Sequence, residues 1–124
     1  MKAMEIHCID TEFSVCKVRD CAGIDLEGEF LFLGKTDREH SLVCPTDCAP
    51  SDALAREDGW RALRIEGSLD FSLVGVLARI SSILAARGIA IFAVSTFDTD
   101  YILVKSDAFA RAVEALSEAG YASA

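Results

Sequence analysis

The chain lacks the features that mark several large classes of protein. No apolar run approaches the ~18 residues that a membrane-spanning helix needs. Its 12 basic residues are outnumbered by 20 acidic ones and do not gather with aromatic residues, and the net charge of −8 repels a phosphate backbone. We therefore expect neither a membrane segment nor a nucleic-acid partner.

The chain also lacks the cysteine spacing of a metal site or a disulfide scaffold. Its five cysteines are an odd number, and Cys44 and Cys48 form a C-x₃-C pair with no second pair to match. A catalytic cysteine would need a pocket and an orienting group, and would show a depressed pKa. We expect no metal, no cofactor and no enzyme activity, with Cys16 and Cys44 as small buried hydrophobic residues.

No apolar targeting stretch is visible near the N-terminus, and reduced thiols suit the cytoplasm, so we expect a cytoplasmic protein. With 124 residues, 52% of them hydrophobic, and a mean hydropathy of +0.30, the chain can bury a core. This length suits one compact unit or two small interlocked ones.

The second half of the chain carries clear periodic patterns. Apolar residues alternate near Leu63 and recur at the 3–4 spacing of one helical face between Leu73 and Leu84. The pattern predicts, in order, a half-buried strand at 63–66, a helix from 73 that ends at Gly88, a strand at 89–94 covered on both faces or lying at an interface, a strand at 101–104, and a helix from Ser106 or Asp107 to Gly120.

The first half predicts a similar order with a reduced first helix. It contains an alternating strand at 12–19, with Phe13, Cys16 and Val18 facing inward across a bulge, and then a turn-rich loop at 20–28. The pattern continues with a buried strand at 30–33, a strand at 41–44 stopped by Pro45, and one or two helical turns within 50–58 that end at Gly59.

The segment Glu66–Lys105 resembles the ACT domain, above all in its hairpin Ser-Thr-Phe-Asp-Thr-Asp at 95–100. This hairpin is most similar to the aspartokinase-related branch and to bacterial relatives of the CASTOR-type arginine sensors. The resemblance implies an α+β, ferredoxin-like (βαββαβ) fold with antiparallel sheets in two tandem or interleaved ACT-like halves. We place a degenerate half at 1–59 and the ACT domain at 60–124, and we hypothesise that the strand at 12–19 completes the sheet of the later half.

A free amino acid presents a carboxylate beside an ammonium group, so its receptor needs donors beside acceptors. The N–H groups at a helix start suit a carboxylate, and a glycine at position 75 lets a ligand approach them. Hydroxyls and carboxylates of the hairpin suit an ammonium group or a basic side chain. Carried over by position, the resemblance implies a ligand site made of Asp70, Gly75, Val76, Ser95, Thr96, Phe97, Thr99 and Asp100.

The resemblance implies the function of a regulatory, allosteric amino-acid-binding module. Its expected partners are a second copy of the chain and a regulated enzyme or other protein. The alternative is a vestigial ACT-like module that dimerises or binds proteins without a ligand. The hairpin could also be a solvated turn that satisfies its own backbone, and Gly75 could serve only close packing. Arg61 and Arg64, with Arg79 and Arg87, are expected to pair with surface carboxylates.

Overall fold

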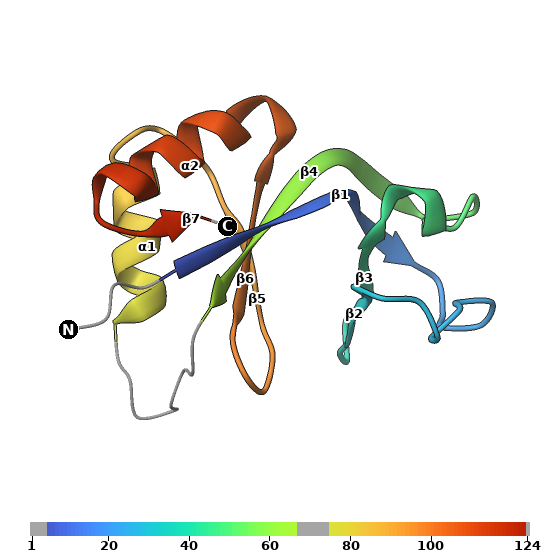
Figure 1. Cartoon of the computed structure of the whole chain (residues 1–124). Helices are drawn as coiled ribbons and strands as arrows, with labels where there is room; N and C mark the ends of the chain where they lie inside the picture. The colour runs from blue at the N-terminus through green and yellow to red at the C-terminus, as the bar shows by residue number, and fades with distance from the viewer. Residues whose placement is uncertain (1–4, 67–74, 124) are drawn as a thin grey trace. The chain divides into compact units, whose positions relative to one another are not determined.

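The computed structural model of the chain describes residues 5–66 and 75–123 (Figure 1). These residues pack as two compact units. The N-terminal unit holds residues 11–60, and the C-terminal unit holds residues 5–10 together with the described part of 61–123. Two strands, β1 (Glu5–Val18) and β4 (Ala55–Glu66), contribute to both units, so the units are interleaved along the sequence.

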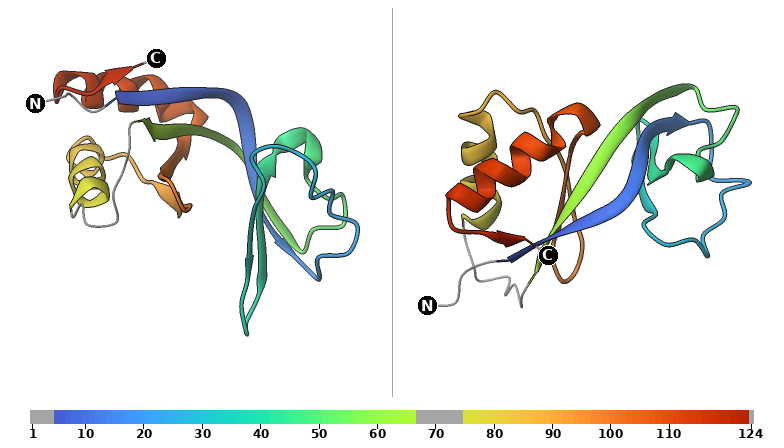
Figure 2. Two further views of the ribbon diagram at one scale, coloured as in Figure 1. Left: turned by 60° about the horizontal axis from the view of Figure 1, so that its bottom comes forward. Right: turned by 45° about the horizontal axis from the view of Figure 1, so that its top comes forward.

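The C-terminal unit is built from a β-sheet and two helices. Its strand order is β1-β4-β6-β5, with β5 at Phe92–Ser95 and β6 at Asp100–Lys105. Helices α1 (Val76–Ala85) and α2 (Phe109–Glu118) lie side by side in both views of Figure 2. Along the chain from β4, a strand, a helix, two strands and a helix follow one another as in a ferredoxin-like unit. In the sheet, the place of the fourth strand, beside β4, is taken by the start of β1.

The core of the C-terminal unit lies between these strands and helices. Its fully buried side chains include Leu63 and Ile65 of β4, Leu84 of α1 and Leu116 of α2. Ile6 of β1 belongs to the same cluster and is only 1% exposed. The short strand β7 (Ala122–Ser123) pairs in parallel with Glu5 and Ile6, so the start of β1 is held by strands on both sides.

The N-terminal unit repeats the strand order with less helix. Its order is β2-β3-β1-β4, with β2 at Phe32–Lys35, β3 at His40–Pro45 and a short 3₁₀ helix at Thr46–Cys48. Turns and bends replace the first helix at 19–30, as the turn signals predict. Its small core contains Cys16, Val18, Leu42 and Cys44, which confirms the buried role expected for the two cysteines. Phe13 is also buried, as predicted.

The prediction of a buried strand at 30–33 is wrong, and the strand predicted at 89–94 is not covered on both faces. The alternative that this strand lies at an interface stays a prediction. Strand β2 begins at Phe32 and lies at one end of the strand order among the described strands, and Leu33 is 40% exposed. Strand β5 begins at Phe92 and, beside β6, lies at the other end of the strand order among the described strands. The apolar run that precedes β5 contributes to the core, because Ile89 is only 5% exposed and belongs to the core cluster of the C-terminal unit.

Two other expectations need correction. The segment 50–58 contains a turn at Ser51 and Asp52 rather than a helix, and β4 already begins at Ala55. The strand that joins the later unit is the segment 5–10, whereas residues 13–18 pair with β3 inside the N-terminal unit. The division into sequence halves 1–59 and 60–124 stays a prediction, and the packing adds residues 5–10 to the later half.

Candidate functional site

The hairpin between β5 and β6 is closed by hydrogen bonds among its own residues. The Thr96 N–H donates to the Thr99 carbonyl at 2.8 Å, and Thr96 Oγ1 donates to the same oxygen at 3.1 Å. Ser95 Oγ donates to Asp100 Oδ1 at 2.5 Å. Three of the polar side chains expected to meet a ligand are thus engaged within the hairpin.

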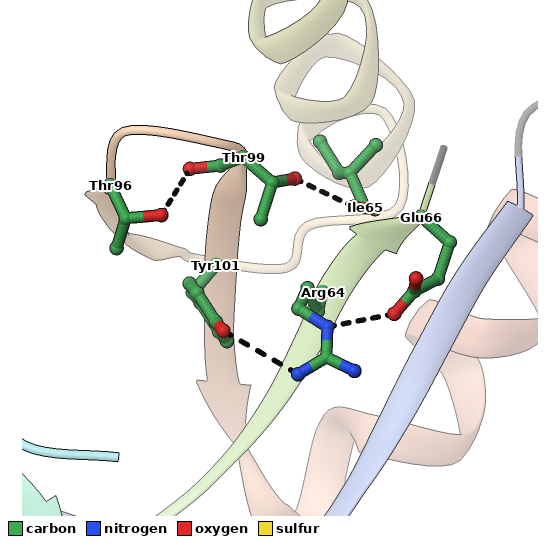
Figure 3. A network of polar contacts seen from close by, with 6 residues as sticks. All are labelled: Arg64, Ile65, Glu66, Thr96, Thr99 and Tyr101. Atoms are coloured by element: carbon green, nitrogen blue, oxygen red, sulfur yellow. Dashed lines mark hydrogen bonds and ion pairs between the residues drawn. The ribbon is translucent and has the colours of Figure 1, made fainter. Parts of the chain in front are cut away.

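The hairpin is also held against the end of β4. Thr99 Oγ1 donates to the Ile65 carbonyl at 2.6 Å, as the dashed line in Figure 3 shows. This bond reaches across 34 positions of sequence and joins the hairpin to the neighbouring strand. It fixes the position of the hairpin relative to the residues that flank Ile65, namely Arg64 and Glu66.

Arg64, Glu66 and Tyr101 form a polar group beside the hairpin (Figure 3). Arg64 Nε donates to Glu66 Oε1 at 2.7 Å, and Arg64 Nη1 lies 3.5 Å from the Tyr101 hydroxyl. The guanidinium carbon is 5.8 Å from the centre of the Tyr101 ring, within the range of a cation–π contact. The hydrogen bond to Tyr101, and then that to Glu66, raise the pKa of Arg64, so its charge is permanent.

These side chains line an open hollow of about 320 Å³ within the C-terminal unit. The Arg64 guanidinium provides donors, whereas carboxylates and hydroxyls provide acceptors. Asp98 on the hairpin has no hydrogen-bond or ion-pair partner among the residues that the structure describes, so its charge is available to a ligand. The lining residues are Arg64, Ile65, Glu66, Thr96, Asp98, Thr99 and Tyr101.

The predicted site residues fall into four groups. Thr96 and Thr99 line the hollow. Ser95, the 82% exposed Phe97 and Asp100 belong to the same hairpin without lining it. Gly75 and Val76 lie at the start of α1 and do not line it either, and Asp70 lies outside the described residues. The structure therefore brings only part of the predicted set together.

Gly75 has a conformational reason to be glycine. Its φ is +84°, in the left-handed region that side chains disfavour, and it immediately precedes the first residue of α1. No described atom lies within 4 Å of the place that a Cβ would take. Close packing is therefore not the reason for this glycine in the described structure. Val76 packs against the core, which gives it a structural role.

The site predicted from sequence omitted five residues that line the hollow, namely Arg64, Ile65, Glu66, Asp98 and Tyr101. Sequence reasoning treated Arg64 as a surface residue that pairs with a carboxylate, and the pair with Glu66 does exist. The usable signal was the alternation of β4, because Arg64 and Glu66 flank buried Ile65 and so share one face of the strand. Tyr101 directly follows the hairpin, so its place beside the hairpin could also have been inferred from the sequence.

Other chemistry finds less support in the described part of the chain. No group of three or more His, Cys, Asp or Glu residues converges there to hold a metal ion. Burial raises the pKa of Cys8, Cys16 and Cys44, the last to about 12, which is the opposite of what an activated thiol requires. Among the described helices, none is long and apolar enough to cross a membrane.

Comparison with known families gives a match that contains the whole hollow. The model of the ACT domain family matches residues 55–118, which is more than half of the chain. The chain belongs to the ACT domain family. The matched segment holds the hairpin and every residue that lines the hollow, together with α1, β5, β6 and α2.

A curated relative carries the same domain within a longer protein. The Homo sapiens protein "Cytosolic arginine sensor for mTORC1 subunit 1" is 38% identical to this chain over 71 residues. The match covers 54% of this chain but 22% of the human protein, so it spans about a fifth of that relative's length. The likeness therefore concerns one ACT region of the sensor.

Solved structures confirm the fold over the whole chain. The crystal structure of protein Atu0741 from Agrobacterium tumefaciens has a TM-score of 0.87 and 28% identity, and the match covers 100% of this chain and 94% of that one. The regulatory subunit of aspartate kinase from Thermus thermophilus has a TM-score of 0.60 and 11% identity, covering 94% and 96%. The α+β, ferredoxin-like ACT fold expected from the sequence is confirmed.

Proposed function

We propose that this chain binds a free amino acid or a close analogue in the hollow beside the Ser95–Asp100 hairpin, and that it serves as a regulatory module without catalysis of its own. The observation that supports this is the mixed charge of the hollow, which sets the Arg64 guanidinium beside the Glu66 and Asp98 carboxylates. A zwitterion needs both signs within one small site. A volume of about 320 Å³ is at the lower end for ligand sites and suits one amino acid.

Arginine is the first ligand to test. Its side chain adds a second positive charge, and Asp98 provides a carboxylate that no described residue neutralises. The human relative is named as an arginine sensor, and its match to this chain is 38% identical. A basic amino acid therefore suits the hollow better than an acidic one.

Thermal unfolding in the presence of each of the twenty amino acids tests the proposal. A ligand at 100 times its Kd adds ~2.7 kcal/mol of stability, which raises the Tm of a domain of this size by on the order of 10 °C. We expect at least one amino acid to give such a shift, with arginine or lysine among the strongest. No shift with any amino acid would contradict the proposal.

Variants of the hairpin locate the site. Asp98→Asn should weaken arginine binding while leaving the melting temperature of the unliganded protein unchanged, because Asp98 has no partner among the described residues. Asp100→Ala tests the assignment made from sequence and should also weaken binding, since its carboxylate holds Ser95. Asp107→Asn is the matched control, because Asp107 lies in the 3₁₀ helix at Ser106–Ala108 and does not line the hollow.

A second candidate function is a dimerisation or protein-interaction module with a vestigial site. It is favoured by the pairing of Ser95 with Asp100 and of Thr96 with Thr99, because these bonds satisfy the hairpin without a ligand. This candidate predicts a stable homodimer in sedimentation experiments, no response to any amino acid, and free exchange of the hairpin side chains.

We also propose that the chain acts as a homodimer in the cytoplasm and passes its signal to a regulated enzyme or other protein. The place of β5 at the end of the strand order in the described sheet supports self-association, because an outer strand can accept a further strand at its edge. Sedimentation with and without arginine tests this, and a monomer under both conditions would contradict it.

A further inference from the structure

Arg64 uses only part of its hydrogen-bonding capacity. A guanidinium carries five N–H donors, and the structure assigns one to Glu66 and one, at 3.5 Å, to Tyr101. The remaining donors sit on the two terminal nitrogens and have no partner among the described residues, and Figure 3 shows one terminal nitrogen without a bond. This end of the side chain belongs to the lining of the hollow.

Two neighbours hold Arg64 in place. The Glu66 carboxylate holds the Nε side of the guanidinium at 2.7 Å, and the Tyr101 ring lies 5.8 Å from its central carbon. The Arg64 side chain is 29% exposed and lines the hollow, so a ligand in the hollow can reach it. A planar group fixed on one edge presents its other edge in a defined direction, which suits bidentate contact with a carboxylate.

We infer that Arg64 binds the α-carboxylate of the amino acid through its terminal N–H groups, with Glu66 and Tyr101 as the residues that position it. This inference rests on the proposed function and specifies the ligand class further. Asp98, which also lines the hollow, receives a positive group of the same ligand. The hollow then requires a ligand carboxylate, and it discriminates against amines and amides of otherwise identical structure.

The test compares each acid with its amide. The probes are L-arginine and L-argininamide, with L-leucine and L-leucinamide as a second pair, and the quantity measured by calorimetry is the ratio of the two affinities within one protein. Because a bond to a charged group is strong, wild-type protein should prefer the acid by at least about tenfold. The ratio cancels general effects of a substitution on the site.

Arg64→Gln should bring this ratio close to one while amide binding persists, and persistent amide binding also shows that the variant is folded. Arg64→Lys should keep part of the preference, since lysine keeps the positive charge but lacks the paired N–H donors of the guanidinium. Tyr101→Phe should give an intermediate ratio, because it removes the hydroxyl and keeps the ring. Arg87→Gln is the matched control, since Arg87 pairs with Glu118 away from the hollow, and it should keep the wild-type ratio.

The outcomes separate the two proposals. If wild-type protein binds acids and amides equally, or if Arg64→Gln keeps the preference, the role of Arg64 is refuted and amino-acid binding stands. If wild-type protein binds neither acid nor amide of either pair, and the twenty-amino-acid screen is also negative, the proposed function fails and the role of Arg64 fails with it.

Discussion

Thr36 and Thr96 close two hairpins in the same way. The Thr36 N–H donates to the Glu39 carbonyl at 2.9 Å, and the Thr96 N–H donates to the Thr99 carbonyl at 2.8 Å. In both turns the threonine Oγ1 reaches the same carbonyl oxygen, at 3.3 Å and 3.1 Å. One hairpin joins β2 to β3 and the other joins β5 to β6, so the two units share a turn as well as a strand order.

The two hairpins share their backbone structure but differ in their charged side chains. The threonine bonds occur in both hairpins, so they belong to the turn itself. The charges differ, because the N-terminal hairpin carries Arg38 and His40 at the positions where the C-terminal hairpin carries Asp98 and Asp100. The N-terminal hairpin also carries Asp37 and Glu39 and so mixes both signs, whereas the charged side chains of the C-terminal hairpin are all carboxylates and suit a cationic ligand better.

The bond from Thr99 to Ile65 should contribute measurably to stability. Thr99→Val removes the hydroxyl and leaves the Ile65 carbonyl without this donor, at a cost of about 1 kcal/mol. Chemical denaturation measures the loss. Thr99→Ser keeps a hydroxyl and should lie closer to wild type, and equal stability of Thr99→Val and wild type would show that the bond contributes nothing.

Arg61 should hold the start of β1 in the C-terminal unit. Its Nε and Nη2 donate to the Ile9 carbonyl at 3.3 and 3.0 Å, and its guanidinium carbon lies 4.3 Å from the centre of the Phe109 ring. Arg61→Met keeps an apolar stem and should lower stability by about 1–3 kcal/mol. Denaturant titration gives the value. Arg87→Gln, which loses an exposed ion pair, should cost less, and the reverse order would refute this role.

A fragment that begins near Asp58 should fail to fold. It lacks residues 5–10, which supply buried Ile6 and Ile9 to the C-terminal unit. We expect an insoluble or unfolded fragment by circular dichroism. Its control is a chain in which residues 1–10 are joined to residues 61–124 by a flexible Gly/Ser linker, which should restore folding. A soluble, folded fragment without residues 1–10 would contradict the interleaved arrangement.

Stability should fall in alkali because of Cys44. Burial, with smaller effects of Cys16 and Cys48, raises the pKa of the Cys44 thiol to about 12, whereas a thiol in an unfolded chain titrates at about 8.5. Between these values the unfolded chain loses the proton and the folded chain keeps it. The free energy of unfolding therefore decreases as pH rises above about 9. Cys44→Val should flatten this decrease, and parallel pH profiles for the two proteins would count against the assignment.

Much of the C-terminal unit could be predicted from sequence. The helix that ends before Gly88 and the strand over Tyr101–Val104 follow from strong periodicity. The positions of β2 and β5 at the ends of the described strand order could not be predicted, because a short apolar run has the same composition at the centre of a sheet as at its edge. The role of residues 5–10 depended on pairing with strands more than fifty positions away, which local patterns do not encode.

The candidate site was predicted in part for a similar reason. The hairpin has a distinctive sequence, so Thr96 and Thr99 were found. Arg64, Glu66 and Tyr101 are ordinary strand residues by themselves, and they become a site only because the bond from Thr99 sets the hairpin beside the end of β4. That bond joins residues far apart in sequence and cannot be read from spacing.

The pairing of β1 with β7 has a consequence for the order of events during synthesis. Glu5 and Ile6 leave the ribosome 117 positions before their partners Ala122 and Ser123, since 122 − 5 and 123 − 6 are both 117. At about 5–20 residues per second the N-terminal segment waits roughly 6–25 seconds with its isoleucines uncovered. The N-terminal unit can close once residue 60 has emerged, whereas the unit that carries the hollow closes only after its last described residues, Ala122 and Ser123, have emerged as well.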